Sequence, residues 1–245
     1  MRHLQWEACY NVRDLGGFTT EDGGQTRWRA LVRSDNLCRL SAAGRQALIN
    51  YGVRTIIDLR YPEELAREPN PFANSRMNHG TNYLNLPPLN EGVEEIAAAF
   101  KGANSMFARY CIAYDYGREG MANAVNAIAE APEGAVLVHC YAGKDRTGRL
   151  VALLLALAGV PYETIAEDYA ESDIRLKPLL AGWINEIADP TERQRAWADI
   201  ANGRQMMRNV LLYLDQKYGD AEEYLRGGGV TEDNLTKIRK RLVEQ

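Results

Sequence analysis

The sequence is poor in histidine and cysteine, with three His and four Cys among 245 residues. The cysteines are widely spaced and form no Cys-x-x-Cys pair, which argues against a disulfide framework and against a zinc knuckle. No group of His, Cys and Asp shows the spacing of metal ligands. We therefore expect no metal, no cofactor and a reducing compartment. The four cysteines are Cys9, Cys38, Cys111 and Cys140.

The chain also lacks a long apolar run and an excess of positive charge. Its longest apolar stretch, 150–160, is far shorter than the roughly 20 residues that span a bilayer, so we interpret it as a buried helix. The N-terminal segment carries charges where a secretory signal needs apolar residues. At a formal net charge of -4, the basic excess needed for nucleic-acid binding is missing. We expect a cytoplasmic protein without an integral membrane segment or a nucleic-acid partner.

The sequence does contain an alternation of short apolar runs with helical patterns. Strands are expected at 55–59, 83–86 and 135–139. One helix is expected from Ser41, as N-cap, to about Tyr51, with Gly52 as its stop. Further helices are expected near 93–114, 120–131, 147–157, 162–171, 193–200, 204–217 and 232–243. This alternation favours an α/β fold with a central, mostly parallel sheet flanked by helices.

We interpret residues 1–245 as a single domain, because no repeat, low-complexity tract or long linker divides the chain. The nearest sign of a boundary lies at 188–190. The segment 185–208 mixes charges with large apolar side chains, which fits either a helical cover over the site or ordinary amphipathic packing. The three glycines at 227–229 are interpreted as a flexible turn.

The segment 139–148 reads His-Cys-Tyr-Ala-Gly-Lys-Asp-Arg-Thr-Gly and joins the apolar run at 135–139 to an apolar helix. The N-terminus of a helix presents unpaired N–H groups and the positive end of the helix dipole, so this loop favours an anion. The same environment favours a thiolate over a thiol. We therefore expect Cys140 to be a charged nucleophile at neutral pH.

The spacing within this segment fits one displacement mechanism. Five residues separate Cys140 from Arg146, so a loop wrapped around one phosphate places the sulfur beneath phosphorus and the guanidinium beside two oxygens. Gly143 and Gly148 allow close approaches that a side chain would obstruct. Thr147 can donate its hydroxyl to the sulfur. These roles predict a covalent phosphocysteine intermediate.

The same segment resembles the HCxxGxxR[S/T] signature of the cysteine-dependent protein tyrosine phosphatase superfamily. Its spelling is most similar to an atypical bacterial and fungal branch of tyrosine and dual-specificity phosphatases. Further blocks that resemble this branch are 11–17, 32–37, 56–60 with the following Pro62-Glu63-Glu64, and 218–225. The likeness is loose over 88–130 and 172–210. It implies a tyrosine phosphatase-like fold and the hydrolysis of phosphate esters.

Ester cleavage also needs an acid that protonates the leaving oxygen, an effect of about 10²–10⁴-fold. Many tyrosine phosphatases carry this acid as an Asp on a separate loop ahead of the cysteine, but 83–92 contains no Asp. The resemblance implies Asp145, inside the loop itself, because the matching Asp has that role in the branch. A purely structural role for Asp145 stays open, and Asp115 is the alternative acid.

The resemblance also implies a set of phosphate-binding residues in the loop. Lys144 adds a second cation beside Arg146, and the same Gly-Lys pair occurs in lipid-phosphatase versions of the loop, which permits phosphoinositide substrates. A rim lysine that attracts any phosphate is the alternative. The expected set is Tyr141, Ala142, Gly143, Lys144, Thr147 and Gly148.

Three residues outside this set are expected to support the site. His139 is expected to orient the loop by hydrogen bonding. Asp58 and Arg60 end a predicted strand, where side chains reach the carboxyl edge of a sheet, and an ion-pair or scaffold role is favoured over chemistry. The same scaffold role is expected of Arg13, Asp14 and Asp35.

Together these features predict a metal-independent phosphomonoester hydrolase that acts on phosphotyrosine proteins, with dual specificity possible in a pocket of suitable depth. Catalysis is assigned to Cys140, Arg146 and Asp145. A phosphoinositide phosphatase is the alternative, and a catalytically silent phosphate-binding module is a weaker one. The expected partner is a phosphorylated protein or phosphoinositide substrate, and the sequence names no partner protein.

Overall fold

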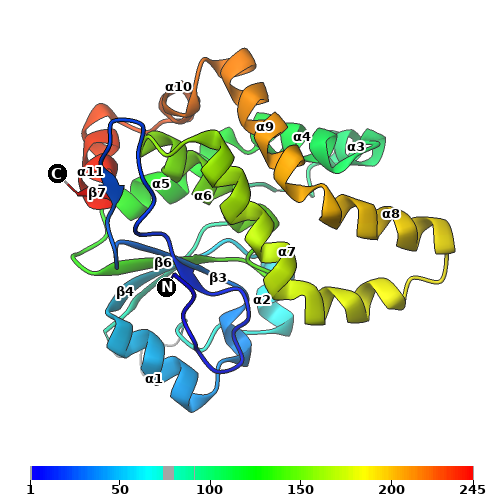
Figure 1. Cartoon of the computed structure of the whole chain (residues 1–245), viewed down its shortest axis with the longest axis horizontal. Coiled ribbons are helices and arrows are strands. Elements are labelled where there is room, and N and C mark those ends of the chain that lie inside the picture. The colour runs from blue at the N-terminus through cyan, green and yellow to red at the C-terminus, as the bar shows by residue number, and fades with distance from the viewer. Residues whose placement is uncertain (1, 74–79, 91, 245) are drawn as a thin grey trace.

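The computed structural model describes residues 2–73, 80–90 and 92–244. Within this part of the chain, the strands form a five-stranded sheet in the order β1-β3-β6-β4-β5 (Figure 1). All neighbours are parallel except β1, which pairs antiparallel with β3. The strands are β1 (Arg13–Asp14), β3 (Leu31–Ser34), β4 (Val53–Asp58), β5 (Asn82–Asn85) and β6 (Ala135–His139). The predicted α/β fold with a mostly parallel sheet is confirmed.

The strand β6 runs through the middle of the sheet, between β3 and β4 (Figure 1). All of its residues are buried, because apolar layers cover both faces of the sheet. Val136 and Val138 join the larger apolar cluster, and Leu137 joins the smaller one on the opposite face. This strand therefore ends at the centre of the carboxyl edge of the sheet, and Cys140 is the next residue.

One face of the sheet is covered by α1 (Ala42–Tyr51), which lies below the sheet in Figure 1. Ser41 caps this helix, because its side chain accepts a hydrogen bond from the Gly44 N–H. Gly52 ends the helix in the left-handed conformation, with φ at 96°. Both predictions for this helix are confirmed. The short 3-10 helix η1 (Leu37–Arg39) precedes it.

The other face is covered by a larger layer of helices, drawn above the sheet in Figure 1. Its central member is α6 (Asp145–Leu157), whose apolar residues are buried in the larger cluster. Around it lie α4 (Met106–Tyr116), α5 (Arg118–Ala129), α7 (Tyr162–Asn185), α9 (Gly203–Tyr218), α10 (Ala221–Gly227) and α11 (Glu232–Leu242). The remaining elements are α2 (Pro62–Arg67), α3 (Glu94–Gly102), α8 (Pro190–Ala201), and the small sheet of β2 (Gln25–Thr26) with β7 (Val243–Glu244).

Two predicted helices have different lengths in the structure. The helix predicted at 93–114 is divided into α3 and α4, because Ser105 accepts from the Ala108 N–H and starts a new helix. The helix predicted at 162–171 continues as α7 to Asn185. The prediction ended this helix too early, and Leu176 and Ile184 in the added part are buried.

Other differences concern short elements and turns. The predictions omitted seven short elements, namely β1, β2, β3, η1, α2, α10 and β7. The segment 188–190 covers the end of the connection between α7 and α8, and Pro190 is the first residue of α8. Gly227 still belongs to α10, so the turn predicted at 227–229 begins later, and it reaches positive φ only at Gly229.

No helix in the described part of the chain combines the length and the apolar composition that crossing a membrane requires.

Candidate active site

The predicted phosphate loop lies between the end of β6 and the start of α6. Cys140 follows the strand directly and is only 3% exposed. Lys144 is the N-cap residue of α6, and Asp145 occupies its first turn. The loop is therefore placed where a helix N-terminus directs unpaired N–H groups and its positive dipole end toward an anion. The predicted strand-loop-helix context of this segment is confirmed.

Buried side chains from other strands and loops hold the outer side of this loop. Asn11 donates from Nδ2 to the carbonyl oxygens of Ala142 and Gly143, both at 3.1 Å. Arg33, on β3, donates from Nη2 to the Gly143 carbonyl at 2.7 Å and to the Lys144 carbonyl at 3.4 Å. These bonds hold the Gly143 and Lys144 carbonyl groups on the outer side of the loop.

Two glycines are required by the way the loop packs. Gly143 has φ at +65°, and a Cβ built there would lie 2.1 Å from the Ser34 carbonyl oxygen. A Cβ at Gly148 would lie 2.8 Å from the ring of Tyr169 on α7. The expectation that these glycines allow close approaches is therefore met, and the approaching groups belong to β3 and α7.

A buried charge network fastens the loop support to α7. Asp168 accepts hydrogen bonds from Arg13 Nε at 2.8 Å and from Arg33 Nη1 at 2.6 Å, and all three side chains are almost fully buried. Arg13 also donates to the Ser172 hydroxyl at 3.0 Å. Burial would raise the pKa of Asp168, but the two guanidinium groups outweigh it and lower that pKa to about 2.

Replacing Asp168 by Asn should lower the free energy of unfolding by about 3–5 kcal/mol at neutral pH, because two buried guanidinium groups lose their charge partner. The native carboxylate has a depressed pKa, so its contribution is present above its ordinary value of 3.8 and is lost as the pH falls toward about 2. Urea unfolding at several pH values checks both points. The exposed Asp189→Asn is the control, and equal stability of wild type and Asp168→Asn at neutral pH would contradict the expectation.

The predicted supporting residues form a second buried network on the β4 side. His139 Nδ1 lies 3.0 Å from the Cys140 carbonyl oxygen, to which it donates, and its Nε2 lies 3.3 Å from Asp58 Oδ2. Asp58 also accepts from Arg60, Asn70 and Tyr83. Burial opposes ionisation of Asp58, but His139 and Arg60 lower its pKa well below the ordinary range. These contacts support the loop, and the Asp58 side chain is fully buried.

Arg146 is held in place by a carboxylate from α2. Its two terminal nitrogens donate to the two oxygens of Glu64, with Nη2 at 2.8 Å from Oε1, and its guanidinium lies 4.6 Å from the centre of the Tyr61 ring. Glu64 also accepts from the Tyr61 N–H at 2.8 Å, so the capping box of α2 and the arginine share one carboxylate. Burial opposes the charge on Arg146, but Glu64 and Cys140 together raise its pKa.

Asp145 faces two buried tyrosines. Its Oδ1 accepts from the Tyr110 hydroxyl at 2.6 Å and lies 3.3 Å from the Tyr169 hydroxyl, which is itself 2.7 Å from that of Tyr110. Burial, followed by the charge of Asp145, raises the pKa values of both tyrosines well above the ordinary range, so they remain neutral. These contacts hold one carboxyl oxygen of Asp145, Oδ1, in place.

Asp115, the alternative acid, lies in a different environment. It accepts from the hydroxyl groups of Tyr213 and Tyr218 and pairs with Lys217 at 2.8 Å, all on α9. These contacts fasten α4 to α9. Among the described residues that line the pocket at Arg146, Asp115 is absent. The geometry therefore favours Asp145 over Asp115.

The other loop residues differ in how they fit the predictions. Lys144 does not face the pocket near Arg146; its Nζ lies 2.5 Å from Asp173 on α7. Tyr141 lines a smaller cavity with Glu64 and neighbouring residues of α2. The Thr147 hydroxyl is buried and has no hydrogen-bond partner among the described residues, so its donation to the sulfur stays a prediction.

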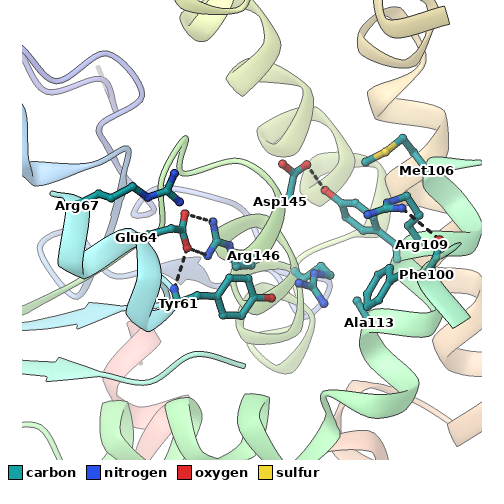
Figure 2. A pocket seen from close by; sticks show the side chains of 11 residues that line it. Tyr61, Glu64, Arg67, Phe100, Met106, Arg109, Ala113, Asp145 and Arg146 are labelled. Atoms are coloured by element: carbon teal, nitrogen blue, oxygen red, sulfur yellow. Dashed lines mark hydrogen bonds and ion pairs between the residues drawn. The ribbon is translucent and has the colours of Figure 1, made fainter. Parts of the chain in front are cut away.

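A pocket of about 500 Å³ opens beside the loop (Figure 2). Figure 2 shows Asp145 and Arg146 between two walls, with Arg67 and Glu64 on one side and Arg109 on the other. None of the described lining residues comes from 185–208, so the helical cover remains a prediction. The lining residues are Tyr61, Glu64, Arg67, Phe100, Met106, Arg109, Tyr110, Ala113, Asp145, Arg146 and Arg149.

A cysteine at the end of the central strand, an anion-accepting loop and an arginine held by a carboxylate define the class of the cysteine-dependent phosphatases. The chain matches the tyrosine phosphatase family over residues 4–244 and belongs to that family. It is 33% identical over 229 residues to the tyrosine-protein phosphatase of Nostoc commune, covering 87% of this chain and 74% of that relative. It is 28% identical over 269 aligned positions to the triple specificity protein phosphatase PtpB of Mycobacterium tuberculosis, covering 95% of this chain and 96% of the relative. The predicted family and enzyme class are confirmed.

Sequence reasoning missed several residues that shape the site. Glu64 belongs to a block that carried the family resemblance, but nothing in the sequence paired it with Arg146. Asn11 was part of another such block, and its bonds to the loop could not be foreseen. Tyr110 and Tyr169 come from helices of ordinary composition, and only packing brings them to Asp145.

Proposed function

We propose that this tyrosine phosphatase acts through a phosphocysteine intermediate. The Cys140 thiolate attacks phosphorus, the bond from phosphorus to the ester oxygen breaks, and Asp145 gives its proton to that departing oxygen. Water then attacks the phosphocysteine, Asp145 takes a proton from this water, and inorganic phosphate leaves with regeneration of the thiolate. The observation that carries the proposal is the position of buried Cys140 between the end of β6 and the N-terminus of α6, whose first turn contains Arg146.

In this mechanism, Arg146 and the loop N–H groups stabilise the transferring phosphoryl group without a resident metal. Glu64 holds the guanidinium group of Arg146 in place before substrate binds. The side chain of Arg146 therefore loses little conformational entropy when substrate binds. The fork of Arg146 then presents its remaining donors to phosphoryl oxygens. Turnover of an aryl phosphate in the presence of a metal chelator tests the metal-independent reaction, and loss of activity under those conditions would contradict it.

Replacing Arg146 by Lys should lower kcat/KM by about 10²–10³-fold, the effect of losing a fixed donor to developing negative charge. Lysine keeps the positive charge, but its single ammonium group cannot hold Glu64 and two phosphoryl oxygens in one plane. Steady-state kinetics with an aryl phosphate measures the loss. The matched control is Arg204→Lys, at an exposed arginine on α9. A kcat/KM near wild type for Arg146→Lys would show that Arg146 does not bind the phosphoryl group.

The substrate class that we propose is phosphotyrosine in proteins, with dual specificity as a further possibility of the same pocket. Tyr61, Phe100 and Tyr110 line this pocket and suit an aromatic ring. The relatives, a tyrosine-protein phosphatase and a triple specificity protein phosphatase, support the same class. A cytoplasmic location stays a prediction.

A rate panel of phosphotyrosine peptides, phosphoserine and phosphothreonine peptides, and phosphoinositides tests this assignment. We expect the highest kcat/KM for phosphotyrosine peptides. Lys144, whose resemblance to lipid-phosphatase loops suggested the phosphoinositide alternative, pairs with Asp173. A catalytically silent phosphate-binding module would bind these compounds without releasing phosphate from any of them.

A further inference from the structure

A second cavity, of about 450 Å³, lies at the edge of the sheet opposite to the predicted phosphate loop. It is lined by Ala30, which precedes β3, and by Gly134, which precedes β6. These two strands are parallel, so they begin at the cavity and end beside the loop. Part of α11 forms another wall. We call this cavity the basic pocket, and its described lining residues are Arg27, Arg29, Ala30, Ala129, Glu133, Gly134, Lys237, Lys240 and Arg241.

The basic pocket concentrates positive charge in a chain whose formal net charge is -4. Five of its described lining residues are cationic, and Glu133 is the one carboxylate among them. Side chains of one sign around a cavity focus the electrostatic potential and raise the local concentration of ions of the opposite sign. They also repel one another, so an anion bound between them would relieve this repulsion.

The cations of α11 that face away from the basic pocket, or only reach its lining, have acidic partners. Arg239 pairs with Glu222, and Lys237 pairs with Asp233 at 2.6 Å. The remaining four cations of the pocket form no ion pair with a carboxylate in the described part of the chain. These four are Arg27, Arg29, Lys240 and Arg241.

Arg241 is a half-buried cation whose charge is not balanced. Its Nη1 donates to the Gly134 carbonyl at 3.1 Å, and its Nη2 donates to the carbonyls of Ala131 and Pro132. Carbonyl oxygens satisfy N–H donors but carry no net charge. Burial lowers the pKa of Arg241, and no carboxylate among the described residues counteracts this effect. A bound anion would supply the missing negative charge.

Arg29 reaches the basic pocket from an unusual backbone conformation. Its φ is +59°, in the left-handed region that few residues other than glycine adopt. Its N–H donates to Asp14 Oδ2 at 2.9 Å, and its guanidinium lies 5.1 Å from the centre of the Tyr51 ring. Glycine or asparagine would adopt this turn at a lower conformational cost. The arginine found here therefore fits a role for its cationic group in the cavity.

We propose that the basic pocket is a second anion site of this protein and that its ligand is a short chain of linked phosphoryl groups. The cations come from two separate segments, 27–29 and α11, so one compact ligand must contact both. Three of the five are arginines, whose planar fork matches phosphate oxygens. The volume lies within the range of small-molecule sites. The site does not depend on the reaction proposed for Cys140.

The density of charge favours phosphoryl groups over an acidic peptide. A terminal phosphoryl group carries about -1.5 to -2 charges near neutral pH and three acceptor oxygens. A carboxylate side chain carries a single charge, and successive residues of an extended peptide are about 3.3–3.6 Å apart with side chains on alternate faces. Few carboxylates can therefore enter one cavity of this size together.

The lining of the basic pocket also bears on nucleotides as ligands. None of its described lining residues is aromatic, so the pocket offers no ring on which a nucleobase could stack. Recognition would then depend on the phosphoryl groups alone. We therefore expect an inorganic phosphoryl chain to bind about as tightly as a nucleoside triphosphate.

Titration calorimetry with inorganic tripolyphosphate at about 0.1 M salt tests the proposal. Wild type should bind tripolyphosphate at least about tenfold more tightly than orthophosphate at this site. Lys240→Gln and Arg29→Gln should each raise the Kd about tenfold, because each removes a charged hydrogen-bond donor. The matched control is Lys101→Gln, at an exposed lysine of α3 that does not line the pocket, and its Kd should stay within about twofold of wild type.

The predicted phosphate loop also favours anions, so a further pair of measurements separates the two sites. Arg146→Lys changes the loop and should leave tripolyphosphate binding at the basic pocket within about twofold of wild type. Lys240→Gln should keep kcat/KM for an aryl phosphate within about twofold. If Arg146→Lys removes all binding of tripolyphosphate, or if both Lys240→Gln and Arg29→Gln leave it unchanged, the basic pocket is not the site.

Lys240→Gln remains decisive if Arg29→Gln fails to fold, because Lys240 is exposed and its side chain forms no hydrogen bond or ion pair with the described residues. Citrate, adenosine triphosphate and a glutamate-rich peptide test the ligand class in the same experiment. Citrate or the peptide bound as tightly as tripolyphosphate would overturn the phosphoryl assignment. Adenosine triphosphate bound at least about tenfold more tightly would show that a nucleoside is recognised, which would overturn it as well.

Discussion

Cys140→Ser should lose turnover by on the order of 10⁴-fold or more while it retains the fold and the binding of inorganic phosphate. Serine has nearly the same shape, so the loop held by Asn11 and Arg33 keeps its path. Its hydroxyl is a far weaker nucleophile than a thiolate at neutral pH, and the helix N-terminus does not compensate for this difference. Steady-state kinetics, phosphate calorimetry and thermal unfolding measure the three properties.

The matched control is Cys111→Ser, at another buried cysteine of the same chain. Burial and the nearby Asp115 raise the pKa of the Cys111 thiol to about 11, so it is protonated at neutral pH and cannot act as the nucleophile. This variant should keep activity within about threefold, because a protonated thiol has no part in the reaction. Mass spectrometry of acid-quenched wild type should place the phosphoryl group on Cys140, and an active Cys140→Ser or a phosphorylated Cys111 would refute the mechanism.

The position of the predicted phosphate loop in the fold could be predicted because its signals are concentrated in one local segment. The loop 139–148 lies between β6 and α6 where the apolar patterns placed it. The ends of α1 were also predictable, because the side chain of Ser41 and the conformation of Gly52 act within a single turn. Local signals of this kind depend on neighbouring residues and not on the rest of the fold.

The contacts that prepare the site could not be predicted, because each joins residues far apart in the chain. Glu64 reaches Arg146 across 82 positions, and Asp168 reaches Arg33 across 135. Lys144 also has a long-range partner that the sequence did not indicate: the packing of α7 brings Asp173 to it, and its predicted contact with phosphate stays a prediction.

Asp145→Asn should slow phosphorylation of Cys140 by about 10²–10⁴-fold for substrates with basic leaving groups. The effect should be much smaller for activated aryl phosphates, because their departing oxygen needs little protonation. The tyrosine contacts of Asp145 are to Oδ1, so an Asn amide can keep its oxygen toward Tyr110 and lose only the proton donor. Single-turnover rates across a leaving-group series measure the change in slope.

Asp115→Asn is the control that separates acid catalysis from structural support. Its contacts with Tyr213 and Lys217 join α4 to α9, so this variant should lower stability without changing the slope of the leaving-group series. A structural Asp145 would instead slow all substrates by similar factors, because a displaced loop impairs every phosphoryl transfer alike. If only Asp115→Asn makes the rate depend more steeply on the basicity of the leaving group, Asp115 is the acid. Because Tyr110 lies on α4 as well, thermal unfolding of both variants is needed to show that the helix has not moved.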